Sequence, residues 1–213
     1  MVNKQFTMAR VSTQGLVYVD LAGEVFALRD CYVAFANGKR AKNKSFFERL
    51  FNEITYRWTN GVTHAELAFE FMDRHSNIFF VACNLYLGES LKFEFKTKQY
   101  SNTHLWALHR LDLDQPQKTR LFTMCQNNVR QNLYFNVALY WNFCVPSRFA
   151  YNGKLEQKAW CSEHVAHCLK EIGMPQFIDA QPHLIDPGRL LELVRTSTSF
   201  YGPLDCYQVN IAL

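Results

Sequence analysis

An α+β fold is the class that this sequence predicts, and three observations lead to it. Strand-like segments fill most of the first half of the chain with short turns between them, whereas helical patterns dominate the second half. The two patterns do not alternate regularly, as a parallel sheet with crossover helices would require. The chain has 213 residues, of which 48% are hydrophobic, so it can bury the core of a single domain.

The strands are predicted from runs of β-branched and aromatic residues. Residues 16–36 contain such runs with a glycine break, which is typical of two or three short strands. "VTHAELAFEF" (62–71) and "IFFVACNLYLG" (78–88) flank a polar turn and predict an antiparallel hairpin. The strict alternation of residues 91–98 predicts a half-buried strand, and residues 104–113 predict another.

The helices are predicted from apolar spacings of three and four residues. Residues 45–58 show this spacing, and residues 116–133 are helical after a proline. A third helix begins near Trp160 and closes at residue 173, and an aspartate followed by proline begins a short helix over residues 186–197. Residues 134–143 are apolar and aromatic and fit either type.

Composition excludes several classes of protein. The net charge of +4 is mild, and a single basic run, residues 38–44, is too weak a footprint to predict a nucleic-acid partner. No stretch approaches the ~20 apolar residues of a transmembrane helix, and residues 1–15 lack the apolar core of a secretion signal. Seven cysteines, an odd number, lie within hydrophobic patterns, so we expect free thiols and a cytoplasmic protein.

Reactive side chains crowd the start of the helix in "KAWCSEHVAHCLKEIG" (158–173). A tetrahedral zinc ion needs four converging ligands, and this helix offers two or three without a CxxC or HxxxH partner elsewhere, so no metal is predicted. Cys168 fits a buried core thiol. Cys161 differs because it lies in the first turn, where the helix dipole and N–H groups stabilise a thiolate and could hold an oxyanion.

A nucleophilic thiol needs a base, and His64 is the best candidate because it lies in a strand just after a turn. Glu66 lies two residues on, so both side chains share one face of the strand, and the carboxylate could orient the imidazole. A hairpin register centred near residue 74 places Asn84 about opposite His64, as a second possible orienter. By spacing alone, an exposed polar strand face is the favoured interpretation of His64 and Glu66.

Two motifs resemble a known family. "TNGVTHAELAFEF" (59–71) resembles the T-x-G-x-[ST]-H-x-E-L segment of circularly permuted NlpC-type papain-like proteins. "WCSEHVAHCLKEIG" (160–173) resembles their W/F-C-S-E-L-V-A-x-x-L-x-x-x-G helix. Three further segments fit the family pattern in the same chain order: "WALHRLDL" (106–113), "NLYFNVALYWNF" (132–143) and "LIDPGRLLELV" (184–194).

The resemblance implies a single papain-like domain over residues 1–213. In this fold an antiparallel sheet or half-barrel packs against a helix that carries the nucleophilic cysteine. Residues 31–200 correspond to the family core, residues 1–30 to extra N-terminal strands, and residues 201–213 to a tail or a strand.

The resemblance also implies the site residues. In the family the histidine strand comes first and the cysteine helix last, so Cys161 is the implied nucleophile, His64 the base and Glu66 the third member. His164 stands where leucine is commoner and is similar to the "NCEHFV" run of the lecithin:retinol acyltransferase group; it faces the cleft or solvent. Other permuted members carry an acidic residue on the strand after the histidine, and here that strand has none; Glu66 is ranked above Asn84.

The activity implied is that of a thiol hydrolase, a peptidase or amidase that forms a thioester on Cys161 without a cofactor. The substrate is then a peptide, an amide or an acyl ester. Trp160 and Ser162 are expected to line the cleft, although Ser162 and Glu163 could instead stabilise the helix start and Trp160 could pack beneath the helix.

Two alternatives stay open. A lipid-directed acyltransferase or phospholipase is favoured slightly by His164 and by the basic run, and it would contact a membrane surface. A non-catalytic binding or virion-associated module would keep the fold without turnover. Similar proteins occur in bacteria, phages and large DNA viruses, so host cytoplasm or a virion is the expected location if the chain is viral. The oligomeric state is not predicted.

Overall fold

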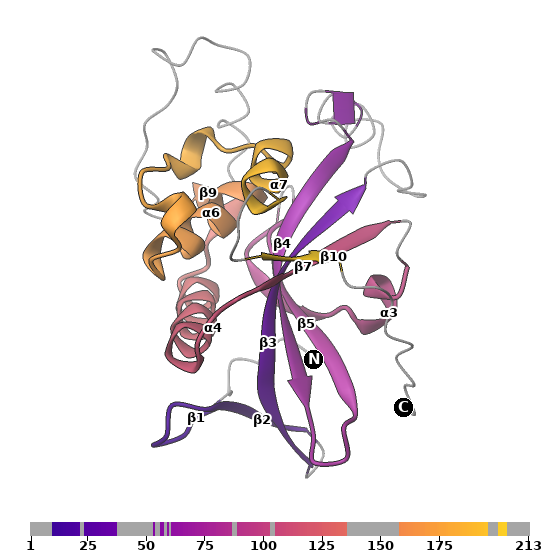
Figure 1. The fold of residues 1–213 in the computed structure, drawn as a ribbon, viewed down its shortest axis with the longest axis vertical. Helices are drawn as coiled ribbons and strands as arrows, with labels where there is room; N and C mark the ends of the chain where they lie inside the picture. The colour runs from indigo at the N-terminus through magenta and orange to yellow at the C-terminus, as the bar shows by residue number, and fades with distance from the viewer. Residues whose placement is uncertain are drawn as a thin grey trace.

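The main feature of the structure, a computed structural model, is a curled antiparallel sheet that forms a half-barrel with a few helices packed on it (Figure 1). The α+β prediction is therefore confirmed. The structure describes residues 10–21, 24–37, 53, 56, 57, 59, 61–86, 89–102, 105–135, 158–195 and 200–203.

The sheet has eight strands. They are β1 (Arg10–Val11), β2 (Val17–Leu21), β3 (Glu24–Asn37), β4 (Val62–Met72), β5 (Ile78–Asn84), β6 (Lys92–Phe95), β7 (Trp106–Leu111) and β10 (Phe200–Pro203). Strands β1 to β6 follow one another in order, and β7 pairs with the second half of β3 on the edge that β2 leaves. The predicted hairpin is confirmed as β4 and β5, whereas β3 is a single strand of 14 residues rather than a short one. A separate parallel pair joins β8 (Tyr134–Phe135) to β9 (Lys158–Ala159).

The helices cover the two faces of the sheet unequally. They are α3 (Thr97–Tyr100), α4 (Gln115–Arg130), α6 (Cys161–Glu171) and α7 (Pro187–Arg195), with the 3-10 turns η4 (Pro175–Phe177) and η5 (Pro182–Leu184). Helices α4, α6 and α7 lie on one side of the sheet, and the short α3 lies on the other (Figure 1). The predicted helices over 116–133, 160–173 and 186–197 are thus confirmed. No helix within the described ranges is long and apolar enough to cross a membrane.

One predicted strand is shorter than expected. The alternating segment 91–98 leaves the sheet after Phe95 and turns into α3. The hydroxyl of Thr97 accepts the backbone N–H of Phe80 at 2.9 Å, and Lys96 donates its N–H to the Phe80 carbonyl at 3.0 Å. These two bonds end the pairing of β6 with β5, and the chain then turns into α3.

Some predictions fall on residues outside the described ranges. These are the basic run 38–44, most of the helix over 45–58, most of the segment 134–143 and the tail beyond residue 203.

Strand β4 is buried on both faces. Its odd-numbered side chains, among them Phe69 and Phe71, pack against the helices and meet the ring of Phe122 at centroid distances of 5.1 and 5.7 Å. Ala68, on the opposite face, packs in a second cluster that includes Tyr100 of α3. Polar side chains on this strand are therefore held inside the protein.

Helix α6 is buried around most of its circumference, because β4, α4, α7 and the two 3-10 turns surround it. At about 100° per residue, five residues share one face of this helix, and all are buried: Cys161, Val165, Cys168, Leu169 and Ile172. The amphipathic prediction understates the burial, however. Four more side chains are buried as well: Ser162, Glu163, His164 and Ala166.

Candidate active site

The thiol of Cys161 lies where the first turn of α6 meets the open edge of β4. The pairing of β4 with β5 reaches only to Leu67, which faces Cys83, so the first residues of β4 are not covered by β5. The backbone N–H groups of Ala65 and of Ser162 lie beside the Cys161 sulfur, where both lower the pKa of its thiol. One of these groups belongs to the strand and the other to the helix N-terminus, where N–H groups lack intrahelical partners.

A tight turn directly precedes β4, the strand that carries His64. Gly61 has φ +97° and donates its N–H to the Tyr56 carbonyl at 2.9 Å, which agrees with the turn expected just before the strand of His64. Helix α7 packs directly on this turn, since a Cβ on Gly188 would lie 2.7 Å from the carbonyl oxygen of Thr59. The close approach explains why glycine is needed at the start of α7.

His64 and Glu66 form a buried hydrogen-bonded chain that ends at Tyr100. The Nε2 atom of His64 lies 3.0 Å from Oε2 of Glu66, and the hydroxyl of Tyr100 donates to Oε1 of the same carboxylate at 2.6 Å. Glu66 is 1% exposed and His64 9% exposed. The exposed polar strand face, which spacing alone favoured for this pair, is therefore wrong, because α3 covers this end of the sheet.

Aromatic side chains fix the plane of the imidazole. The ring of His64 stacks on Tyr86 with centroids 4.7 Å apart and meets the edge of Trp106 at 6.2 Å. Lys96 donates from Nζ to the Tyr86 hydroxyl at 2.6 Å, and its ammonium group lies over both the Tyr86 and Trp106 rings. Sequence reasoning missed Tyr86, Lys96, Trp106 and Tyr100, because their positions depend on the turn into α3 and on the exact register of β5.

The electrostatics of the site favour an ion pair. Burial raises the pKa of the Cys161 thiol, but the charge and hydrogen bond of His64, followed by the N–H groups of Ala65 and Ser162, outweigh it and lower that pKa. Burial lowers the pKa of His64, but the Cys161 thiolate and then Glu66 outweigh it and raise that pKa to about 9. A lowered pKa of Cys161 and a raised pKa of His64 mean that the site favours a thiolate beside an imidazolium.

The neighbouring phenols take no part in this titration. Burial, followed by the negative charge of Glu66, raises the pKa of Tyr86 and of Tyr100 above the ordinary value. Both therefore stay neutral while the Cys161–His64 pair titrates, and the Tyr100 hydroxyl remains a donor to Glu66.

The position expected for Asn84 is wrong. Leu67 faces Cys83 and Met72 faces Ile78, so continuing the same register puts residue 86, not Asn84, opposite His64. Asn84 instead donates from Nδ2 to Oε2 of Glu94 at 2.8 Å. The hairpin turn is centred one residue later than assumed, and this difference moves the partner of His64 by two positions.

Four side chains close to the nucleophile in the sequence, Trp160, Ser162, Glu163 and His164, are buried rather than exposed to a cleft. Trp160 is 2% exposed, and Ser162 is fully buried with its hydroxyl donating to the Ile185 carbonyl at 2.7 Å. Ser162 therefore ties α6 to the segment after η5, contrary to the expectation that it lines a cleft or caps the helix. Glu163 accepts the N–H of Trp160 at 3.3 Å, as expected of a residue that stabilises the helix start. His164 is 1% exposed and faces neither cleft nor solvent.

Comparisons with protein-family models, with curated proteins and with solved structures gave no match for this chain. What the described site offers chemically is a thiol near two backbone N–H groups, an imidazole beside the thiol and a carboxylate behind the imidazole. This set of groups can perform nucleophilic attack by sulfur, assisted by proton transfer through histidine.

Proposed function

We propose that the chain is a thiol hydrolase, a peptidase or amidase of the circularly permuted papain-like type, with Cys161 as nucleophile. The observation that carries the proposal is the buried series Cys161–His64–Glu66, with the thiol at the start of α6 and the imidazole held by a carboxylate. The order of elements along the chain supports it, because the histidine strand β4 precedes the cysteine helix α6 and the two pack together.

The reaction follows from this geometry. The Cys161 thiolate attacks the carbonyl carbon of an amide, so that a C–S bond forms while the C–N bond breaks, and the His64 imidazolium gives its proton to the leaving amine. Water then attacks the thioester; His64 takes a proton from it, a C–O bond forms and the thiolate leaves. The backbone N–H of Cys161 is our candidate donor to the oxyanion.

Glu66 acts on the imidazole rather than on the substrate. Because Nε2 of His64 is bound to Glu66, Nδ1 is the ring nitrogen left to exchange a proton with Cys161. The carboxylate keeps this orientation and stabilises the imidazolium, as in other cysteine and serine nucleophile systems.

The decisive test is the rate at which iodoacetamide alkylates Cys161 across a pH series, read by peptide mass spectrometry. In the wild type, labelling should rise with a midpoint below the ordinary thiol value of about 8.5. In His64→Ala the opposing charge is gone and burial remains, so the midpoint should move upward and labelling at pH 6 should fall roughly 10²-fold.

Two controls accompany this test. Cys168 and Cys125 in the same sample report how buried thiols of the same protein react, and Cys161→Ala identifies the labelled peptide. If Cys161 labels no faster than Cys168 and the profile ignores His64→Ala, the hydrolase proposal is wrong. If the ion pair is present, libraries of acyl amides and esters, with liposome co-sedimentation, separate amide hydrolysis from a lipid-directed activity.

A further inference from the structure

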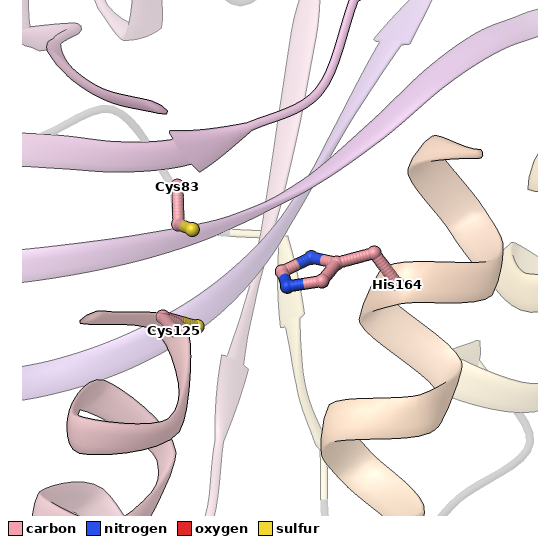
Figure 2. A group of neighbouring side chains, drawn as sticks. All are labelled: Cys83, Cys125 and His164. Carbon is pink, nitrogen blue, oxygen red and sulfur yellow. The ribbon is translucent and has the colours of Figure 1, made fainter. Parts of the chain in front are cut away.

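A second group of sulfur and imidazole ligands lies in the core, where three elements meet. Cys83 of β5, Cys125 of α4 and His164 of α6 place their ligand atoms within 4.8 Å of one another, and all three residues are buried. Figure 2 shows the imidazole of His164 reaching from its helix toward the two thiols. None of these side chains belongs to the Cys161–His64 pair.

A fourth ligand stands beside them. Cys168 lies one turn after His164 on α6, with its sulfur 3.6 Å from Nε2 of that histidine. The thiol of Cys125 lies beside those of both Cys83 and Cys168 and interacts with each of them. Three sulfurs and one imidazole therefore form one contiguous group, and Cys168 is fully buried.

The spacing of these atoms suits a tetrahedral zinc ion. With Zn–S bonds of about 2.3 Å and Zn–N bonds of about 2.0 Å, tetrahedral ligands stand about 3.5 Å apart for sulfur to nitrogen and about 3.8 Å apart for two sulfurs. The distance from the Cys168 sulfur to Nε2 of His164 is close to the first value. The ligand atoms of Cys83, Cys125 and His164 lie within 4.8 Å of one another, and Cys168 stands outside that group of three, so closing the site requires the Cys168 side chain to move inward.

At Nε2, the buried imidazole of His164 meets a distant amide and a sulfur. The amide nitrogen of Asn128 lies 3.4 Å from Nε2 of His164, and the Cys168 sulfur lies 3.6 Å from the same atom. The amide contact is long for a polar group in the core, where an imidazole needs strong partners, whereas 3.6 Å is an ordinary distance for a contact to sulfur. A metal ion would supply such a partner.

We propose that Cys83, Cys125, Cys168 and His164 hold one zinc ion in a closed, structural site. Binding replaces the three thiol protons, which pass to solvent, and leaves no open position for substrate. The ion links β5, α4 and α6, and so fixes the helix that carries Cys161. This departs from the expectation of no metal, because the ligands come from distant segments without a CxxC or HxxxH pair.

The first experiment measures metal in the purified full-length wild-type chain by elemental mass spectrometry after dialysis against metal-free buffer. We expect one zinc per chain, and a strong chelator should lower the Tm by roughly 10 °C. Replacement by Co²⁺ should give thiolate-to-cobalt charge transfer and the intense visible bands of tetrahedral cobalt.

Matched variants locate the ion. Cys125→Ala and Cys31→Ala each remove one fully buried thiol, but only Cys125 is a proposed ligand. Zinc and the cobalt spectrum should be lost in Cys125→Ala and retained in Cys31→Ala. Cys161→Ala should also keep the metal, so this proposal and the hydrolase proposal fail separately.

The wild-type readings decide the matter even if Cys125→Ala does not fold. A folded wild-type chain that holds no zinc, gives no tetrahedral cobalt spectrum and keeps its Tm in chelator overturns the proposal. A disulfide between any two of the three cysteines in that protein overturns it too.

Discussion

Helix α6 contributes to two groups of thiol and imidazole, the Cys161–His64 pair and the core group around His164. The two groups differ in the direction in which the pKa of their thiols is shifted. The partners of Cys161 lower its pKa, whereas burial raises the pKa of Cys83 and of Cys125. A hydrogen bond with Cys125, followed by burial, raises the pKa of Cys168. All four residues are buried, so burial alone does not set the chemistry of a thiol here. The neighbouring charges and hydrogen-bonding groups set the pKa of each thiol.

The position along the helix explains much of this contrast. Cys161 is the first residue of α6, where N–H groups are free of intrahelical bonds and the dipole favours an anion. Cys168 lies two turns further on, where the backbone N–H groups are engaged within the helix. Its sulfur therefore meets the Cys125 thiol and the imidazole of His164 rather than backbone amide donors.

Removing the carboxylate behind His64 should move Cys161 toward the behaviour of the core thiols, although less far than His64→Ala. In Glu66→Gln the imidazolium loses a hydrogen-bonded anion, so the pKa of His64 should fall below about 9 and that of Cys161 should rise. The pH range in which the Cys161 thiolate and the His64 imidazolium coexist therefore becomes narrower at both its lower and its upper end. Alkylation of Cys161 at pH 6 should fall roughly ten-fold, the effect of about one pKa unit.

The groups that face His64 make this test clean. Tyr86 and Tyr100 stay neutral, and Lys96 is anchored to the Tyr86 hydroxyl and to Glu94. An unchanged pH profile in Glu66→Gln, with Tm and fold retained, would show that Glu66 does not act on the pair.

The features that the sequence predicted correctly depend on local patterns. The turn at residues 60–61 is marked by Asn-Gly, the start of α7 by Asp186 and Pro187, and the hairpin by a polar turn between two apolar runs. His64 and Glu66 share a face because alternate residues of a strand always do. The start of α6 at Cys161 follows from the same kind of local signal.

The features that the sequence did not predict depend on how separate elements pack. Tyr100 reaches Glu66 only because Thr97 ends β6 and turns the chain into α3. The core thiols meet because α4 lies beneath β5 and beside α6, and no spacing in the sequence reports that arrangement. Contacts of this kind need the tertiary structure.

A smaller effect on the reactivity of Cys161 is expected at Tyr100, which contacts Glu66. Tyr100→Phe removes the 2.6 Å hydrogen bond to Glu66 and leaves the ring in place. The net value of such a bond, about 0.5–1.5 kcal/mol, predicts a roughly three-fold slower alkylation of Cys161 at pH 6. Measurement of the full pH profile should show the same shape with a small upward shift of the midpoint.

Tyr32→Phe is the matched control for this variant. Tyr32 is also a buried tyrosine on the α3 side of the sheet, and its hydroxyl donates to Glu70 of the same strand β4. It has no contact with His64 among the described residues. Both variants should lose similar stability, but only Tyr100→Phe should change the reactivity of Cys161; equal rates in the two would remove Tyr100 from the site.

The smallest effect is expected at Asn84, which is next to the proposed zinc ligand Cys83 in the sequence. It follows Cys83 directly on β5, and adjacent residues of a strand point to opposite faces, so its amide meets Glu94 while the Cys83 sulfur enters the core. Asn84→Ala removes this hydrogen bond, and the Tm should fall by about 2–4 °C for the loss of about 1 kcal/mol. The pH profile of Cys161 and the metal content should both stay as in the wild type. A changed profile would mean that Asn84 acts on the pair through Glu66, which the continued register places opposite it, and lost metal would mean that the two faces of β5 are coupled.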